Sequence, residues 1–213
     1  MSNELMSILQ SKLNDDQFMQ QLSQQIGGAE KEKTQKAATG VVSTLMSAMA
    51  KNAATPEGAN SLSNALERDH DGSILDDTIG MLTGQNQQAS NASRMLNGSG
   101  ILSHLLGGKQ NGAIKMISQM SGLDDQKTGN LMTMLAPILM GALGKTKRQK
   151  GLDAGDIFNL LNGSLTAQKQ STGNQTMDMI SRFIDQDGDG DITDDAMRIG
   201  GSLLKRFFGK KRR

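Results

Sequence analysis

The chain of 213 residues carries a formal net charge of +1, and it contains no Cys, Trp or Tyr. The absence of Cys excludes disulfides, zinc sites with Cys ligands and a Cys nucleophile, and the small net charge does not suit a protein that binds nucleic acid through a strongly basic surface. Fifteen Met, five Phe and two Val favour helices packed through aliphatic side chains over strands. The composition therefore predicts an all-α protein.

The first residues lack the basic stretch followed by an apolar run that marks a secretion signal. No stretch approaches about 20 consecutive apolar residues, the length that a membrane-spanning helix needs. We therefore expect a cytoplasmic protein.

Helices are expected along the first part of the chain. Two short helices are predicted within residues 2–27, and the acidic pair Asp15-Asp16 marks the start of the second. A longer helix is predicted over residues 31–51, where apolar side chains recur at helical spacing. The sequence Thr55-Pro56-Glu57-Gly58 should interrupt the helical pattern, and another helix is expected over residues 58–67.

The second part of the chain repeats this organisation. Residues 85–98 are polar and low in complexity, which predicts a linker, and a helix is expected over residues 99–106. Residues 28–51 resemble residues 122–145 at one constant offset, which indicates an internal repeat. Pro137 stands where the first copy has Ser43, and a proline inside a helix predicts a kink.

The predicted organisation is therefore two related helical-bundle halves followed by a C-terminal helix-loop-helix. Residues 1–84 form the first half and residues 99–165 the second, with the linker over 85–98 between them. Residues 166–213 hold an acidic loop and a basic amphipathic tail.

Four stretches together resemble the YidB-like family of bacterial proteins, a domain of unknown function. They are residues 67–77, residues 98–107, Ser121-Gly122-Leu123, and residues 131–144 around Ala136-Pro137-Ile138-Leu139. The resemblance covers roughly residues 1–165 and leaves the C-terminal part outside. It implies small all-helical domains in a homeodomain-like arrangement, and it implies no known activity, substrate or catalytic residue.

The sharpest chemical signal is an acidic pattern over residues 185–195 that follows the EF-hand calcium loop. Gly190 stands where that loop turns sharply and Ile192 where an apolar side chain anchors it, but Ala196 replaces the usual bidentate Glu. Mutual repulsion of the carboxylates favours a bound calcium ion, while the alternative is a solvated acidic turn that caps the last helix. The predicted calcium ligands are Asp185, Asp187, Asp189, Asp191, Asp194 and Asp195.

A less complete copy of the acidic pattern lies over residues 67–77, at an offset different from that of the helical repeat. The alternative for this copy is an Asx turn followed by a helix that Asp76 caps. The predicted ligands of this second metal site are Glu67, Asp69, Asp71, Ser73, Asp76 and Asp77.

The C-terminal tail, residues 205–213, alternates basic and apolar side chains at near-helical spacing. This pattern is typical of helices that bind an anionic membrane surface or an acidic protein groove, and an ordinary packed helix with a frayed end is the alternative. A nucleic-acid partner is less expected, because the predicted helices show no basic stripe with base-reading residues. The basic residues of the tail are Lys205, Arg206, Lys210, Lys211, Arg212 and Arg213.

The sequence does not predict an enzyme. It contains no recognisable nucleophile turn and no phosphate-binding glycine loop. We expect His104 to be partly buried on its helix and His70 to be a solvated turn residue. The predicted function is a non-catalytic interaction or self-assembly module modulated by calcium. The alternatives are a protein of the anionic membrane surface that uses the basic tail, and a nucleic-acid binder.

Overall fold

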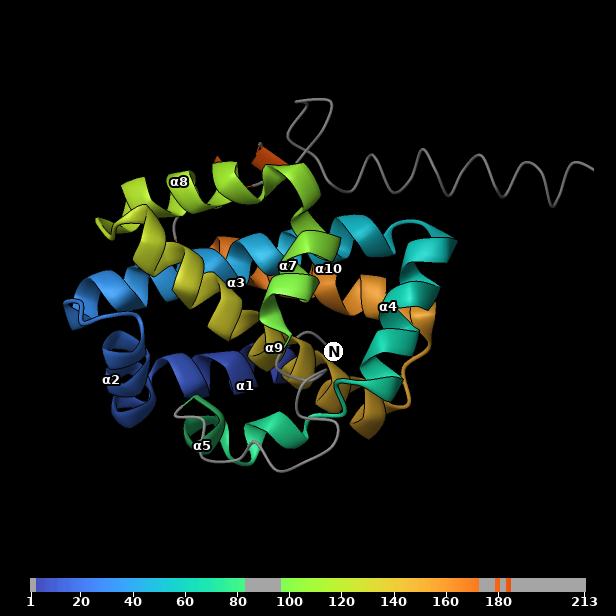
Figure 1. Cartoon of the computed structure of the whole chain (residues 1–213). Helices are drawn as coiled ribbons and strands as arrows, with labels where there is room; N and C mark the ends of the chain where they lie inside the picture. The colour runs from blue at the N-terminus through green and yellow to red at the C-terminus, as the bar shows by residue number, and fades with distance from the viewer. Residues whose placement is uncertain (1–2, 83–96, 173–178, 181–182, 185–213) are drawn as a thin grey trace, which may run out of the picture.

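The computed structural model describes residues 3–82, 97–172, 179–180 and 183–184 (Figure 1). These residues form helices and turns without strands, which confirms the all-α class. The elements are α1 (Asn3–Leu13), α2 (Asp16–Gln25), α3 (Lys31–Ala53), α4 (Pro56–Arg68), the 3-10 helix η1 (Ser73–Leu75), α5 (Thr78–Leu82), α7 (Gly98–Leu106), the 3-10 helix η2 (Gly107–Lys109), α8 (Gln110–Ser121), α9 (Asp125–Lys150) and α10 (Ala154–Thr172).

Helix boundaries follow the capping signals of the sequence. The carboxylate of Asp15 accepts hydrogen bonds from the N–H groups of Gln17 and Phe18, at 2.9 and 3.1 Å, and so begins α2. Helix α4 begins at Pro56, two residues earlier than predicted. The hydroxyl of Thr55 accepts a hydrogen bond from the N–H of Gly58. Proline suits the first helical position, because the N–H that it lacks would have no partner within the helix there.

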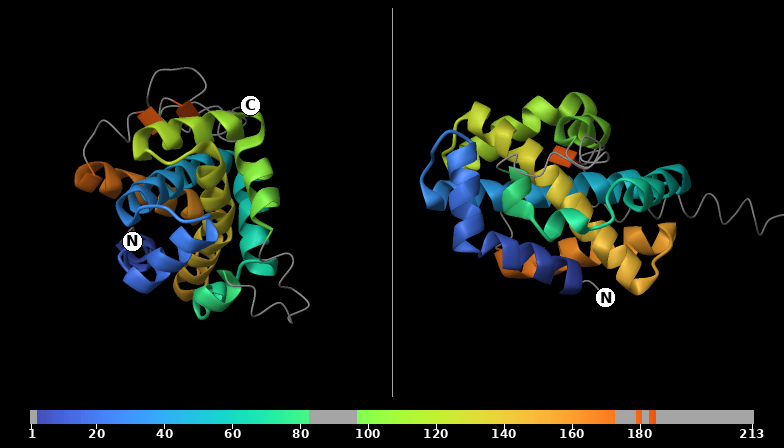
Figure 2. Two further views of the ribbon diagram at one scale, coloured as in Figure 1. Left: turned by 60° about the vertical axis from the view of Figure 1, so that its left-hand side comes forward. Right: turned by 60° about the horizontal axis from the view of Figure 1, so that its bottom comes forward.

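Helix α3 is the centre of the fold. Every residue from 40 to 50 is buried, because α4, α7, α8, α9 and α10 all pack against it (Figures 1 and 2). A helix buried on all sides needs small or apolar side chains around its whole circumference, and α3 supplies Gly, Ala, Ser, Thr, Val, Leu and Met there. One continuous core contains Leu45 of the predicted first half and Leu139 of the predicted second half. The two halves therefore share one interior.

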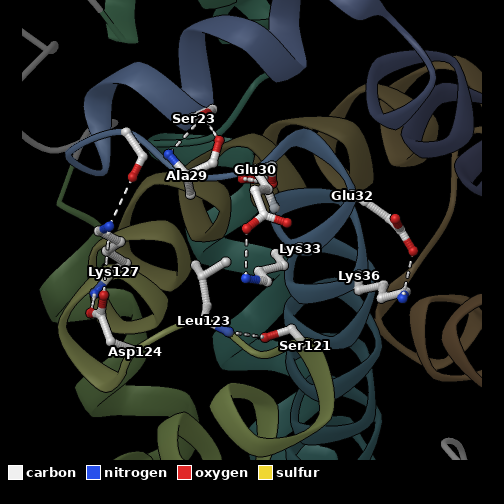
Figure 3. A network of polar contacts seen from close by, with 12 residues as sticks. Ser23, Ala29, Glu30, Glu32, Lys33, Lys36, Ser121, Leu123, Asp124 and Lys127 are labelled. Carbon is white, nitrogen blue, oxygen red and sulfur yellow. Dashed lines mark hydrogen bonds and ion pairs between the residues drawn. The ribbon is translucent and has the colours of Figure 1, made fainter.

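The starts of α3 and α9 lie side by side and exchange contacts (Figure 3). The ammonium group of Lys127 donates to the carbonyl of Gly28 at 2.8 Å. Reciprocally, Lys33 lies beside Gly122, where an added Cβ would be 3.6 Å from the lysine Cε. Both glycines have φ of 74°, a conformation that glycine adopts without strain. Two pairs of residues related by the constant offset, Gly28 with Gly122 and Lys33 with Lys127, thus make reciprocal contacts.

Helix α9 runs from Asp125 to Lys150 with Pro137 inside it. Proline has no N–H, so the carbonyl of Thr133, four residues earlier, loses its usual partner. Gly98, the first residue of α7, packs against this carbonyl: an added Cβ at Gly98 would stand 1.9 Å from the Thr133 oxygen. Pro137 and Gly98 together let the start of α7 approach the backbone of α9.

Within the described part of the chain, no helix combines the length and the apolar character needed to cross a bilayer.

Candidate functional site

The acidic stretch over residues 67–77 folds as a turn between α4 and α5. Gly72 adopts a left-handed conformation with φ of 95°, and Ile74 is buried. Both features match the EF-hand pattern, which needs a glycine turn followed by an apolar anchor. The turn packs on α9, where an added Cβ at Gly141 would lie 2.2 Å from Cγ2 of Ile74. The small residues of α9 therefore leave the space in which the acidic turn packs against this helix.

Basic side chains near the C-terminal end of α9 neutralise this turn. We call Lys145, Lys147 and Arg148 the basic face of α9. Lys147 pairs with Glu67 at 2.5 Å and Arg148 with Asp71 at 3.5 Å. Lys145 stands 3.9 Å from Asp76. Each of these carboxylates pairs with a cationic side chain that lies more than 65 residues away in the sequence.

Two of the predicted ligands of the turn, Asp71 and Asp69, also have polar partners close in the sequence. Asp71 accepts from the hydroxyl and the N–H of Ser73, at 2.6 and 3.0 Å. These bonds, with the Arg148 guanidinium, hold the pKa of the Asp71 carboxyl below its usual value. Asp69 lies 3.7 Å from Arg68.

The capping residue of α5 is Asp77, which accepts from the N–H of Gly80 at 2.8 Å. Asp76 pairs with Lys145 and does not cap the helix, which corrects the sequence-based alternative. Within the described residues, no three His, Asp or Glu side chains gather as a metal site requires. The carboxylates of residues 67–77 are directed to separate partners.

The C-terminal ligands predicted from the sequence, residues 185–195, lie outside the described residues, as does the tail over 205–213. Of the residues just before them, 179–180 and 183–184 are described, and three of these pack on the helical body. Ile180 and Ile184 are buried, and the Phe183 ring lies over Gly112, where an added Cβ would be 2.8 Å from the ring. The chain therefore enters the acidic pattern from a fixed position.

Two lysines fix that position. The ammonium groups of Lys51, at the end of α3, and Lys109, in η2, both donate to the carbonyl of Ile184, at 3.0 and 3.1 Å. Both lysines and Ile184 line one pocket of about 490 Å³. Neither contact could be predicted from the sequence, since each lysine donates to a main-chain atom far away in the chain.

The two histidines have the reverse of the predicted exposures. His70 is 5% exposed, whereas His104 is exposed. Burial lowers the pKa of the His70 imidazole, against the opposing effects of the Asp69 and Asp71 carboxylates. His104 lies on the outer face of α7 because Leu102 and Leu106, one turn apart, form the buried face. That spacing was a signal from which its exposure could have been predicted.

The family model described as bacterial protein of unknown function (DUF937) matches residues 7–146. The chain belongs to the DUF937 family. YidB is in this family, so the resemblance found in the sequence is confirmed. The DUF937 match includes α3, the acidic turn and α9 as far as Thr146, and it ends before residues 185–195. No curated protein and no solved structure matches the chain.

Proposed function

We propose that this DUF937 protein is a non-catalytic interaction module whose acidic segment, residues 185–195, binds calcium and relays that binding to the helical body. The observation that supports the proposal is the pair of hydrogen bonds from Lys51 and Lys109 to the carbonyl of Ile184, the residue directly before Asp185. A cation bound by this segment is therefore close to the ammonium groups of Lys51 and Lys109, and its charge is felt by both.

The electrostatics of the segment favour a weak and reversible calcium site. Six carboxylates within residues 185–195 repel one another unless a cation balances them. Ala196 lacks the bidentate carboxylate of an EF-hand, and nearby ammonium groups oppose an incoming divalent ion. We therefore place the dissociation constant at roughly 10⁻⁵ to 10⁻³ M, the weak end of the EF-hand range.

The turn over residues 67–77 supplies an internal comparison. There, Lys145, Lys147 and Arg148 balance the carboxylates of an acidic pattern of the same type. A protein cation can thus take the place that a metal ion has in an EF-hand. For residues 185–195 we propose that Lys51 and Lys109 have this role without calcium, and that calcium competes with them.

The interaction itself is assigned to the C-terminal segment. Among the described residues, Met179 is the one large hydrophobic side chain that is exposed, at 47%. With one such side chain, the described surface shows no cluster of exposed large hydrophobic residues that would suit self-association. The sequence after Ile184 contains Leu203, Leu204, Phe207 and Phe208 among its basic residues, which suits contact with another copy or with an acidic partner.

Light scattering of the full chain tests this function. We expect the mean mass to differ between millimolar calcium and a chelator, and the difference to vanish in the Asp187→Ala/Asp189→Ala variant. A matched control is Asp71→Ala/Asp76→Ala, which removes two carboxylates from the other acidic pattern and should keep the calcium response. An identical mass in calcium and chelator would contradict self-association controlled by calcium.

A further inference from the structure

A second pocket lies between residues of α4 and residues of α7. Its volume is about 320 Å³, within the usual range for small-molecule sites. Leu62 and Ala65 of α4 line one wall, Ile101 and Leu105 of α7 line the other, and Met140 of α9 also contributes. The pocket therefore has an apolar lining that can accommodate a small aliphatic group.

The lining also contains a buried polar group without a partner. His70 is 5% exposed, and its Nδ1 atom makes no hydrogen bond within the part of the chain that the structure describes. Native proteins rarely leave a buried polar atom unpaired, because its lost hydration is not replaced. The main chain of His70 cannot move away, since its carbonyl packs against Gly144 of α9. The His70 imidazole is therefore held in the lining of the pocket, and its Nδ1 atom is available for a hydrogen bond with a ligand.

The two asparagines of the lining already have structural hydrogen bonds. The amide nitrogen of Asn52 donates to the carbonyls of Ala48 and Leu105, at 2.8 and 3.3 Å, and so links α3 to α7. The side-chain oxygen of Asn97 accepts from the N–H of Gly100 at 2.9 Å and caps α7. These bonds fix the walls, and the other polar side chains of the lining are Ser61, Asp69, His70 and His104, of which Asp69 and His70 lie together on the turn after α4.

The charge of the lining selects against anions. Among the described residues that line the pocket, Asp69 is the acidic one and none is Lys or Arg. Its ion-pair partner Arg68 lies outside the lining, 3.7 Å away with a 71% exposed side chain. A carboxylate and a neutral imidazole both accept hydrogen bonds, and a primary ammonium group brings three donors and a positive charge.

We propose that the α4–α7 pocket binds a small organic primary amine. The ammonium group is received by Asp69 and His70, and the aliphatic or aromatic body lies against Leu62, Ile101 and Leu105. Its described lining residues come from α3, α4, α7 and α9 and from the turns beside them. It gives the protein a ligand of the amine class in addition to calcium.

Three probes of equal chain length test the proposal on the full chain in the presence of a chelator. Pentylamine, pentan-1-ol and pentanoate are titrated separately while the imidazole NMR signals of His70 and His104 are followed. His70→Gln and His104→Gln assign the two signals. We expect saturable shifts with pentylamine in the millimolar range, at least threefold weaker binding of pentan-1-ol, and no saturable shift with pentanoate.

Two variants test whether Asp69 is the residue that selects for the charged amine. Asp69→Asn should remove the preference for pentylamine over pentan-1-ol. Asp76→Asn changes an acidic residue outside the pocket lining and should keep it. Equal binding of the three probes, tightest binding of pentanoate, or no shift with any probe would each overturn the proposal, and this ranking in the unmodified protein does not depend on how the variants fold.

Discussion

Gly144 of α9 lies against the main-chain carbonyl of His70, so closely that an added Cβ would stand 1.8 Å from that oxygen. The contact joins the acidic turn to α9 and holds His70 in the lining of the α4–α7 pocket. Because the neighbouring atom belongs to the backbone, a larger residue at position 144 can be accommodated only if the turn moves.

We predict that Gly144→Ala destabilises the fold by about 2–3 kcal/mol, the effect of overpacking a close contact. The matched control is Gly129→Ala in the same helix, where an added Cβ would make an ordinary contact, 3.4 Å from Ile114. That change should be neutral or stabilise by up to about 1 kcal/mol, because alanine is the better helix former. Urea unfolding measures both, and equal midpoints for the two variants would contradict the contact.

The pair of Lys147 and Glu67 should contribute a measurable coupling energy. The Lys147 side chain is 12% exposed and that of Glu67 is 61% exposed, so we expect about 0.5–1 kcal/mol at low salt. A double-mutant cycle with Lys147→Met and Glu67→Gln isolates the coupling energy. The same cycle on the exposed pair of Lys36 and Glu32 should give about 0.3–0.5 kcal/mol. No coupling at the first pair would show that the basic face of α9 does not stabilise the turn.

Buried His70 should make the stability of the protein fall in mild acid. Burial lowers its pKa in the folded state, so below the ordinary value of about 6.5 the unfolded chain binds the proton more readily. Stability is therefore full above about pH 6.5 and declines as the pH falls towards the folded-state pKa. His70→Gln should flatten this decline, measured by unfolding at a series of pH values. His104→Gln, at an exposed position, should keep it, and a decline carried by His104 would contradict the assignment.

Removing the lysines at Ile184 should strengthen calcium binding. In a water-like medium, one ammonium group on the order of 8 Å from Ca²⁺ costs about 1 kcal/mol, roughly a fivefold change in affinity. We therefore expect tighter binding by Lys51→Met and by Lys109→Met, measured by calorimetry. Lys36→Met, on the same helix as Lys51 but paired with Glu32, should leave the affinity unchanged. Weaker calcium binding in both lysine variants would contradict competition.

Local signals in the sequence were enough to predict most helices. The extent of α3 follows from the spacing of its apolar residues, and the start of α2 follows from Asp15. These features depend on neighbours within a turn or two of the helix, which the sequence displays directly.

The candidate sites were harder to predict because their partners are distant in the chain. The acidic turn over residues 67–77 showed its carboxylates but not the basic face of α9, which neutralises them. His70 was expected to be solvated because it lies in the acidic turn, whereas in the structure it is buried and its carbonyl packs against Gly144. Charge density alone therefore indicates a need for a counter-charge, and the fold decides whether a metal ion or a protein side chain supplies it.

Calorimetric titration of the full chain with calcium tests the central claim most directly. We predict a saturable heat with a dissociation constant of roughly 10⁻⁵ to 10⁻³ M, lost in Asp187→Ala/Asp189→Ala and kept in Asp71→Ala/Asp76→Ala. No heat from the unmodified protein at millimolar calcium, or an unchanged heat after the loss of Asp187 and Asp189, would contradict the calcium site.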